Sequence, residues 1–412
     1  MKLDDLNSSL ESACLDFLGG APLVYHCHHF NLFLDQTVDD AVGSARGWEL
    51  RRDMAHQAWL QLLSAVADGV GAHTPAERLT ACQQLYAAMG HGRMAVTADR
   101  GRGAAEGEFL HYGFAWKQKY GAQVRRHRPV DAVAAGFAAA ATQVAHRTAE
   151  PLVAVETGCI AKEDPRCTFE IAPGGPPPGR VVHESDLRPV EPRTGLAEER
   201  ISAINAGLRN FLGGVAGDDR GLVEAFGVFV TRHMTNYYNG ISYGAVDVVR
   251  ERSEALVPMV EGLLRESGHV CVFNTFGGIL YSPEWDALVG RIEGDLTEVV
   301  SSCCAIARAL GFGAWTIEEL SPKRLVVTTS TEYESPWCAT VRTEPCPGAS
   351  YFLQGAAVAF MRLALDLDWK ARRPLTRELY DDLFKGDSRW RVEQPDSLAA
   401  GSAVSRVVVE SR

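Results

Sequence analysis

One short stretch of this chain places a carboxylate and two thiols at a spacing that suits a metal ion. Glu156, Cys159 and Cys167 form the pattern E-x2-C-x7-C. Thiolate sulfur together with carboxylate oxygen suits zinc, which takes about four tetrahedral ligands at roughly 2.0–2.3 Å. The alternative is that both cysteines are buried for packing alone, because Cys is often found in protein interiors. Paired thiols beside an acid favour the metal.

The residues around the motif predict a hairpin that would bring these side chains together. Apolar residues 152–155 lead into the motif, and residues 168–171 follow it with strand character. Asp164-Pro165 is typical of a turn between two strands. Such a turn would fold both thiols back toward the carboxylate.

A fourth ligand must come from outside the hairpin. Residues 129–145 have helical character, with Asp131 near the start of the segment and His146 just past its end. Either side chain could complete a tetrahedron. The alanine-rich middle of this segment favours close packing against a sheet rather than chemistry.

The motif resembles the 4-vinyl reductase domain family, which includes the zinc-containing part of the sensor modules of phenol- and xylene-responsive bacterial transcription activators. Glu156, Cys159 and Cys167, preceded by a Gly-containing helix and an apolar strand, carry the resemblance. In those sensors a cysteine stands five residues before a helix glycine, and here Asp131 stands five residues before Gly136. The resemblance therefore implies that Asp131 is the fourth zinc ligand, and an oxygen ligand there makes the site harder.

The same resemblance implies a pocket for a small aromatic or hydrocarbon-like molecule. The pocket tryptophan of the sensors resembles Trp116, although its spacing to the fourth ligand position is shorter here. One polar donor in an apolar cavity is enough to orient a phenol-like ring. The candidate donors are His28, His91 and His111. His28 belongs to a predicted half-buried strand, 23–30, and a metal at that strand would need a further group such as His111.

Length and composition limit the class of protein. The chain has 412 residues, 46% of them hydrophobic, which suits two globular domains. A net charge of -11 argues against nucleic-acid binding, and no phosphate-binding loop is found. No apolar run approaches the roughly 18 residues of a membrane span, so a cytoplasmic protein with reduced cysteines is expected.

A Pro- and Gly-rich stretch divides the chain. Residues 172–179 can continue neither a strand nor a helix, because proline lacks the N–H donor and glycine favours turns. The predicted organisation is a module over residues 1–173, a linker over 174–200, a second module over 201–395 and a tail over 396–412. Helical spacing predicts helices over 201–212, 222–234 and 248–264, the last with a kink at Pro258.

The second module is interpreted as a degenerate tandem copy of the first. Residues 270–276 parallel the strand 23–30, and the helix 351–365 parallels the helix that contains Gly136. Residues 385–390 are matched to 162–167, so that Trp390 stands at the position of Cys167. An indole does not bind zinc, so the second copy is expected to lack the metal.

These observations predict an α+β protein of two related modules, each a helical part followed by a small antiparallel sheet with a hairpin. The first functional hypothesis is a zinc-stabilised small-molecule-binding or sensory protein that has no ATPase or DNA-binding segment, so its signal would pass through a protein partner or a homodimer. The alternative is a metal- or His-dependent biosynthetic enzyme that acts on an aromatic or tetrapyrrole-like substrate. A closed four-ligand zinc favours the first, and an open metal position favours the second.

Overall fold

The α+β architecture predicted from the sequence is confirmed by the computed structural model, which describes residues 6–121, 127–187, 193–342, 350–386 and 389–412. Its strands form three antiparallel sheets. They are β1 (Asn7–Leu10), β2 (Leu15–Leu18), β3 (Ala21–Cys27), β4 (Ala95–Asp99), β5 (Arg102–Gly107), β6 (Leu152–Gly158), β7 (Cys167–Pro173), β8 (Val223–Ala225), β9 (Val228–Met234), β10 (Trp315–Ser321), β11 (Arg324–Thr329), β12 (Trp390–Asp396) and β13 (Ser405–Ser411).

Helices cover these sheets and fill the space between them. They are α1 (His28–Val42), α2 (Ser44–Gly69), α3 (Pro75–Ala88), α4 (His111–Tyr120), α5 (Ala132–His146), α6 (Glu198–Gly213), α7 (Thr235–Arg252), α8 (Val257–Cys271), α9 (Gly277–Tyr281), α10 (Pro283–Leu288), α11 (Leu296–Ala309), α12 (Ser335–Thr340), α13 (Tyr351–Asp366) and α14 (Arg377–Phe384). Among the described helices, none is both long and apolar enough to cross a membrane.

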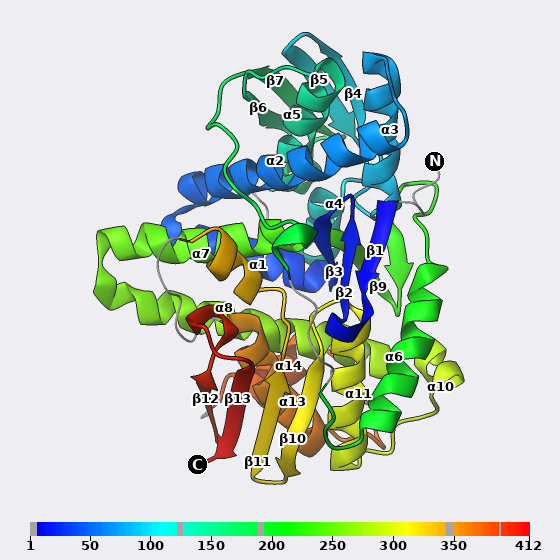
Figure 1. The fold of residues 1–412 in the computed structure, drawn as a ribbon, viewed down its shortest axis with the longest axis vertical. Coiled ribbons are helices and arrows are strands. Elements are labelled where there is room, and N and C mark those ends of the chain that lie inside the picture. Colours follow the sequence, from blue (N-terminus) through cyan, green and yellow to red (C-terminus); the bar gives the residue numbers. More distant parts are fainter. Residues whose placement is uncertain (1–5, 122–126, 188–192, 343–349, 387–388) are drawn as a thin grey trace.

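The central sheet joins the two halves of the chain. Its strand order is β1-β2-β3-β9-β8, so β3 from the N-terminal half pairs with β9 from the C-terminal half. Tyr25 lies opposite Arg232 at the middle of this antiparallel ladder. Helix α1 follows β3 directly and α7 follows β9 directly, so this one pairing places both helices in the middle of the molecule (Figure 1).

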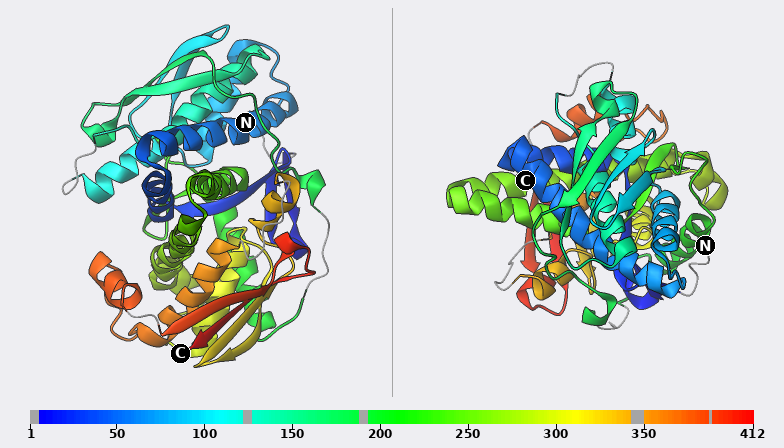
Figure 2. Two further views of the ribbon diagram at one scale, coloured as in Figure 1. Left: turned by 90° about the vertical axis from the view of Figure 1, so that its left-hand side faces the viewer. Right: turned by 90° about the horizontal axis from the view of Figure 1, so that it is seen from above.

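The other two sheets lie at opposite ends of the molecule (Figures 1 and 2). One has the order β4-β5-β7-β6, and the other has the order β10-β11-β13-β12. Helix α5 packs between the first sheet and α2, while α13 packs between the second sheet and α8. Because α5 is buried on all sides, its sequence is almost wholly apolar and rich in alanine.

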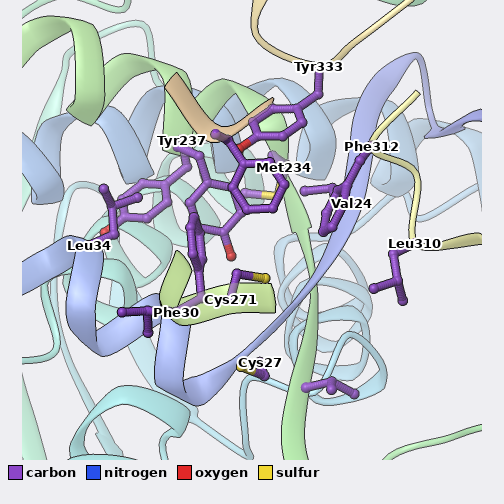
Figure 3. Packing of buried hydrophobic residues seen from close by; sticks show 14 of the residues in the cluster. Val24, Cys27, Phe30, Leu34, Met234, Tyr237, Cys271, Leu310, Phe312 and Tyr333 are labelled. Atoms are coloured by element: carbon purple, nitrogen blue, oxygen red, sulfur yellow. The ribbon is translucent and has the colours of Figure 1, made fainter. Parts of the chain in front are cut away.

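The hydrophobic core runs without a break through both halves. Phe30 and Leu34 of α1, Met234 and Tyr237 around the start of α7, and Cys271 at the end of α8 meet at the central sheet (Figure 3). The halves therefore share buried surface as well as a sheet, and the domain boundary predicted near residue 174 does not separate two independent cores.

Several elements differ from the sequence prediction. Residues 222–234 form the hairpin β8–β9 rather than a helix, because Phe226 and Gly227 take left-handed backbone conformations (φ 54° and 71°) and β-branched residues flank the turn. Residues 270–276 are helical rather than extended. The expected kink at Pro258 is a break, since α7 ends at Arg252 and α8 starts at Val257 with the proline in its first turn.

The C-terminal residues are part of the fold. The expected tail over 396–412 contains β13, which lies between β11 and β12 in its sheet. The match of Trp390 to Cys167 is also wrong, because Trp390 starts the edge strand β12 whereas Cys167 starts β7 in the interior of its sheet. Asp387 and Ser388 of that match, and residues 188–192 of the predicted linker, lie outside the described residues.

Close packing of α5 on α2 gives a test of the fold. A Cβ atom at Gly136 would lie 2.6 Å from the Cβ of Ala55 and 2.6 Å from the backbone N of His56. Gly136→Ala should therefore reduce the free energy of unfolding by about 1–3 kcal/mol through overpacking. Gly207→Ala is the control, since a Cβ there meets nothing within 4 Å on α6. Gly207→Ala should stabilise the protein by about 0.5–1 kcal/mol through helix propensity. Urea unfolding that gives the same change in stability for both variants would contradict the close packing at Gly136.

Candidate metal centre and buried histidine cluster

The hairpin of β6 and β7 forms as predicted and positions the E-x2-C-x7-C motif. A register shift between Glu156 and Gly158 ends the regular ladder. The carbonyl of Cys159 accepts hydrogen bonds from the backbone N–H groups of Lys162 (2.8 Å) and Asp164 (3.2 Å). The carboxylate of Asp164 in turn accepts from the Cys159 N–H at 2.8 Å. This closed turn folds the loop back so that Cys159 faces the first residue of β7.

The three motif side chains converge inside the protein. Potential ligand atoms of Glu156, Cys159 and Cys167 all lie within 4.8 Å of one another. Tetrahedral zinc separates its ligands by about 3.5 Å, so small side-chain shifts would suffice. The Oε1 atom of Glu156 is buried and lacks a hydrogen-bond partner among the described residues, while Oε2 accepts from the Asp131 N–H at 2.8 Å. A buried carboxylate oxygen that faces two thiols fits a metal.

Asp131 lies beside this cluster as the N-cap of α5. Its Oδ1 accepts from the Ala134 N–H at 3.2 Å and its Oδ2 from the Gly113 N–H at 3.3 Å. A Cβ at Gly113 would lie 3.1 Å from the Cys167 sulfur and 3.6 Å from Asp131 Oδ2, so only glycine leaves this gap open. Asp131 is not within the 4.8 Å group, and its role as fourth ligand stays a prediction.

His146 lies too far along the helix to serve as a ligand. It is the last residue of α5, and its Nε2 lies 3.2 Å from the carbonyl oxygen of Ala98 on β4. Asp131 is at the opposite end of the same helix. The geometry thus leaves Asp131 as the better placed of the two candidates.

The charges of the cluster depend on one another. A hydrogen bond from Cys167 lowers the pKa of Cys159 to about 6, which favours its thiolate at neutral pH. Burial raises the pKa of Glu156 well above its ordinary value, and the Cys159 thiolate raises it further. Burial also raises the pKa of Asp131 to about 7. These raised pKa values favour the protonated carboxyls when no cation is near, and a divalent metal at this position would favour their ionised forms instead.

The four residues predicted to line a ligand pocket are His28, His91, His111 and Trp116. His91 and His111 are fully buried with ring centroids 6.3 Å apart, and the His111 N–H donates to the carbonyl of His91 at 3.0 Å. His28 lies next to Phe229, whose carbonyl oxygen is 3.4 Å from His28 Nδ1. Trp116 is 7% exposed on α4 and contacts Tyr120. Common lining of one pocket by all four residues stays a prediction.

His91 is held in place by two glycines. Gly90 and Gly92 have φ values of 85° and 97°, which a side chain would strain. A Cβ on Gly90 would also lie 2.5 Å from the carbonyl oxygen of Val230 on β9. The Arg232 N–H donates to the carbonyl of Met89 at 3.0 Å. The C-terminal half therefore braces the segment that carries His91.

Three aromatic partners of His91 were not found from the sequence. The His91 ring lies 4.8 Å from His233, 5.0 Å from Tyr86 and 5.1 Å from Trp59, measured between ring centroids. Among the described residues, no well-formed hydrogen bond reaches several buried polar atoms here, namely both ring nitrogens of His91 and of His233, the Tyr86 hydroxyl and the Trp59 N–H. Buried polar groups are normally paired, so this concentration of unpaired atoms is unusual.

Burial keeps these imidazoles neutral. It is the main cause that lowers the pKa of His91 well below its ordinary value, and the neighbouring His233 lowers it further. The pKa values of His111 and His233 are lowered in the same way. A neutral imidazole carries one donor and one acceptor nitrogen, so the cluster can both give and accept hydrogen bonds.

A surface pocket of about 520 Å³ reaches the metal motif from outside. Glu156 and the exposed Val155 line it together with Trp48 and Arg52 of α2. The guanidinium of Arg52 lies 5.3 Å from the centroid of the Trp48 ring. The residues predicted to line a ligand pocket, which are His28, His91, His111 and Trp116, do not line this surface pocket. It is therefore separate from the histidine cluster.

Comparison with known proteins gives one solved structure to report. The crystal structure of the phenol-responsive sensory domain of the transcription activator PoxR with phenol is similar to this chain, with 20% sequence identity and a TM-score of 0.33. The match covers 39% of this chain and 80% of that one. At this score the likeness assigns neither a family nor a ligand. No family model matches the chain, and no curated protein matches it.

The pH dependence of folding tests the burial of His28. Burial is the main cause that lowers the pKa of His28 from 6.5 to about 4, and the charge of Lys119 lowers it further. The unfolded chain binds a proton there below about pH 6.5 and the folded chain only near pH 4, so stability is lost as pH falls through this window. His28→Gln should remove up to about 3 kcal/mol of that loss.

Urea unfolding at pH 7, 5.5 and 4 would measure this difference. His73→Gln, at an exposed position before α3, is the matched control and should follow the wild type. Parallel pH profiles for all three proteins would show that His28 does not contribute.

Proposed function

We propose that this chain is a zinc-stabilised protein that binds a small aromatic or hydrocarbon-like molecule through its buried histidine cluster. The observation that carries the proposal is the pair of fully buried side chains His91 and Tyr86, whose polar side-chain atoms have no well-formed hydrogen bond. Leaving such groups unpaired costs about 1–3 kcal/mol each, a cost that a bound molecule with one polar group would offset.

The class of ligand follows from the surroundings of His91. Trp59, Tyr86 and Phe137 pack around one another with ring centroids 4.0–5.4 Å apart, so the environment is aromatic. A ring would be stabilised by burial and edge-to-face contacts, and its one hydroxyl would pair with a neutral imidazole. His91 and His233 are the residues that would orient it, one from each half of the chain.

The metal in this proposal is structural. Zinc would be held by Glu156, Cys159 and Cys167, with Asp131 as the fourth ligand, and would tie the N-terminus of α5 to the β6–β7 hairpin. Zinc supplies charge neutralisation and a rigid tetrahedral link when bound. Helix α5 carries Phe137, whose ring centroid lies 4.0 Å from that of Tyr86, so the metal would support the ligand cluster indirectly.

One observation favours the alternative of a metal-dependent enzyme. Glu156 lines the 520 Å³ surface pocket, so a small substrate could approach the metal from solvent. In that case one coordination position would be held by water rather than by Asp131. X-ray absorption spectroscopy on wild type and Asp131→Ala distinguishes the two. A coordination sphere that changes on mutation supports the structural role, and an unchanged sphere supports the enzyme.

The metal assignment predicts about one zinc per chain. The double variant Cys159→Ser, Cys167→Ser should lose the zinc and, at metal concentrations about 1,000 times Kd, about 4 kcal/mol of stability. Cys82→Ser is the control, because Cys82 is buried on α3 away from the cluster. Elemental analysis and thermal unfolding measure both effects. Zinc that remains stoichiometric in the double variant would refute the site.

The ligand assignment predicts opposite effects of one small change. Tyr86→Phe removes a buried hydroxyl that has no partner in the described part of the chain, so the ligand-free protein should become more stable by up to about 1 kcal/mol. Binding of phenol or methyl-substituted phenols should weaken about 5- to 100-fold, because a hydrogen bond available only to the ligand is lost. Calorimetry with this panel measures affinity, and thermal unfolding measures stability.

Tyr120→Phe is the matched control, since Tyr120 lies on α4 beside Trp116 and outside the histidine cluster. It should leave affinity unchanged. Binding that survives both Tyr86→Phe and His91→Phe would show that the ligand lies elsewhere.

A further inference from the structure

The C-terminal half contains a second buried polar cluster at positions that correspond to the metal motif. The sheet orders β4-β5-β7-β6 and β10-β11-β13-β12 are the same when each strand is numbered within its own half. In that frame β12 corresponds to β6 and β13 to β7. Gln394, Ser397 and Ser405 then repeat the motif spacing as Q-x2-S-x7-S.

The local backbone follows the same course in both hairpins. The carbonyl of Cys159 accepts from the N–H groups three and five residues later, at 2.8 and 3.2 Å. The carbonyl of Ser397 does the same, at 3.1 and 3.0 Å. A short 3-10 turn starts directly after each of these residues, at Ile160 and at Leu398. This agreement sets the register of the comparison independently of side chains.

The link from hairpin to helix is also repeated. In the N-terminal half the Asp131 N–H, at the start of α5, donates to Glu156 at 2.8 Å. In the C-terminal half the Ser350 N–H, at the start of α13, donates to Gln394 Oε1 at 3.4 Å. The four positions of the predicted zinc site are therefore occupied in the second half by Ser350, Gln394, Ser397 and Ser405.

A carboxylate takes up the centre of the second cluster. Glu332 is 1% exposed, and its Oε1 accepts hydrogen bonds from the hydroxyls of Ser335, Ser350 (2.6 Å) and Ser405. Three hydroxyl donors on one oxygen stabilise a buried negative charge without a cation.

Two of the serine hydroxyl oxygens also accept a hydrogen bond from another group. Gln394 Nε2 donates to Ser350 Oγ at 3.0 Å, and the Leu398 N–H donates to Ser405 Oγ at 3.1 Å. The Ser350 and Ser405 hydroxyls thus donate to Glu332 and each accept from a second group, which leaves these two oxygens little lone-pair capacity for a metal. Among the described residues that form this cluster there is no cysteine, so they lack the affinity for zinc that two sulfurs would give.

We propose that the two halves are repeats of one unit, and that in the C-terminal half the carboxylate of Glu332 replaces the metal as the link between hairpin and helix. The metal part of this inference rests on the zinc site proposed above. If both parts hold, the supply of metal controls the order of only one of the two hairpins. Loss of the ion would loosen β6, β7 and the start of α5, while β12, β13 and the start of α13 would stay ordered.

Hydrogen exchange of the full-length protein with and without a chelator tests this asymmetry. Protection of residues 152–173 should fall at least about 10-fold on chelation, and protection of residues 390–411 should not change. Elemental analysis should find one zinc per chain. Two zinc ions per chain, or equal loss of protection in both hairpins, would overturn the inference.

A second variant tests the carboxylate itself and does not depend on the metal. Glu332→Leu should keep the zinc content of the wild type but lower the protection of residues 390–411 at least about 10-fold. Glu332→Gln should lower that protection less, because an amide oxygen still accepts hydrogen bonds from the serines. Glu393→Leu, at an exposed position on β12, is the control and should change nothing.

Unchanged protection in Glu332→Leu would overturn the role of the carboxylate even if zinc is found. If no zinc binds at all, the zinc site has failed, and the two Glu332 variants still decide whether a hydrogen-bonded centre holds the second hairpin.

Discussion

The pairing of β3 with β9 is the contact on which the arrangement of this molecule depends. Each strand runs directly into a central helix, so the ladder centred on Tyr25 and Arg232 fixes the direction of α1 and α7 together. The same strand β9 presents the Val230 carbonyl to Gly90 and carries His233 to within 4.8 Å of His91, between ring centroids. A shift of the ladder by one residue would turn His233 to the other face of the sheet. The candidate ligand cluster therefore exists only in this register.

The same pairing brings together buried polar atoms from both halves that have no well-formed hydrogen bond among the described residues. Neither half alone encloses His91, because Trp59 and Tyr86 come from one half and His233 from the other. His111 is linked to the same junction through Asn31, whose side-chain amide lies 3.0 Å from His111 Nε2 and donates to the Thr231 hydroxyl of the other half at 3.1 Å. Side chains that meet only after the halves have packed cannot be paired within local structure, so they remain available to water or to a bound molecule.

The metal hairpin could be predicted from the sequence because all of its information is local. The spacing of Glu156, Cys159 and Cys167, the apolar strand before them and the turn after Cys159 lie within a few residues of one another. The helix that was predicted at 222–234 failed for the opposite reason. Its apolar residues fit the spacing of a helix as well as that of a strand. The strand forms because it pairs with β3, which lies some 200 residues earlier in the chain. His233 was missed with it.

The proposed repeat shows a related limit of sequence reasoning. Shared Lys, Asp and Arg residues suggested the match of 385–390 to 162–167, yet the backbone hydrogen bonds favour a correspondence at Ser397 and Ser405. Exposed charged residues recur by chance, whereas a turn that closes on one carbonyl is fixed by geometry. Both hairpins solve the same problem, which is to hold a strand pair against the N-terminus of a buried helix. One has thiols and a carboxylate, which we propose hold a cation, and the other has hydroxyls around the carboxylate of Glu332. If the first hairpin binds zinc as proposed, dependence on a metal would be confined to the half that carries His91, because the hydroxyls around Glu332 stabilise its charge by hydrogen bonds alone.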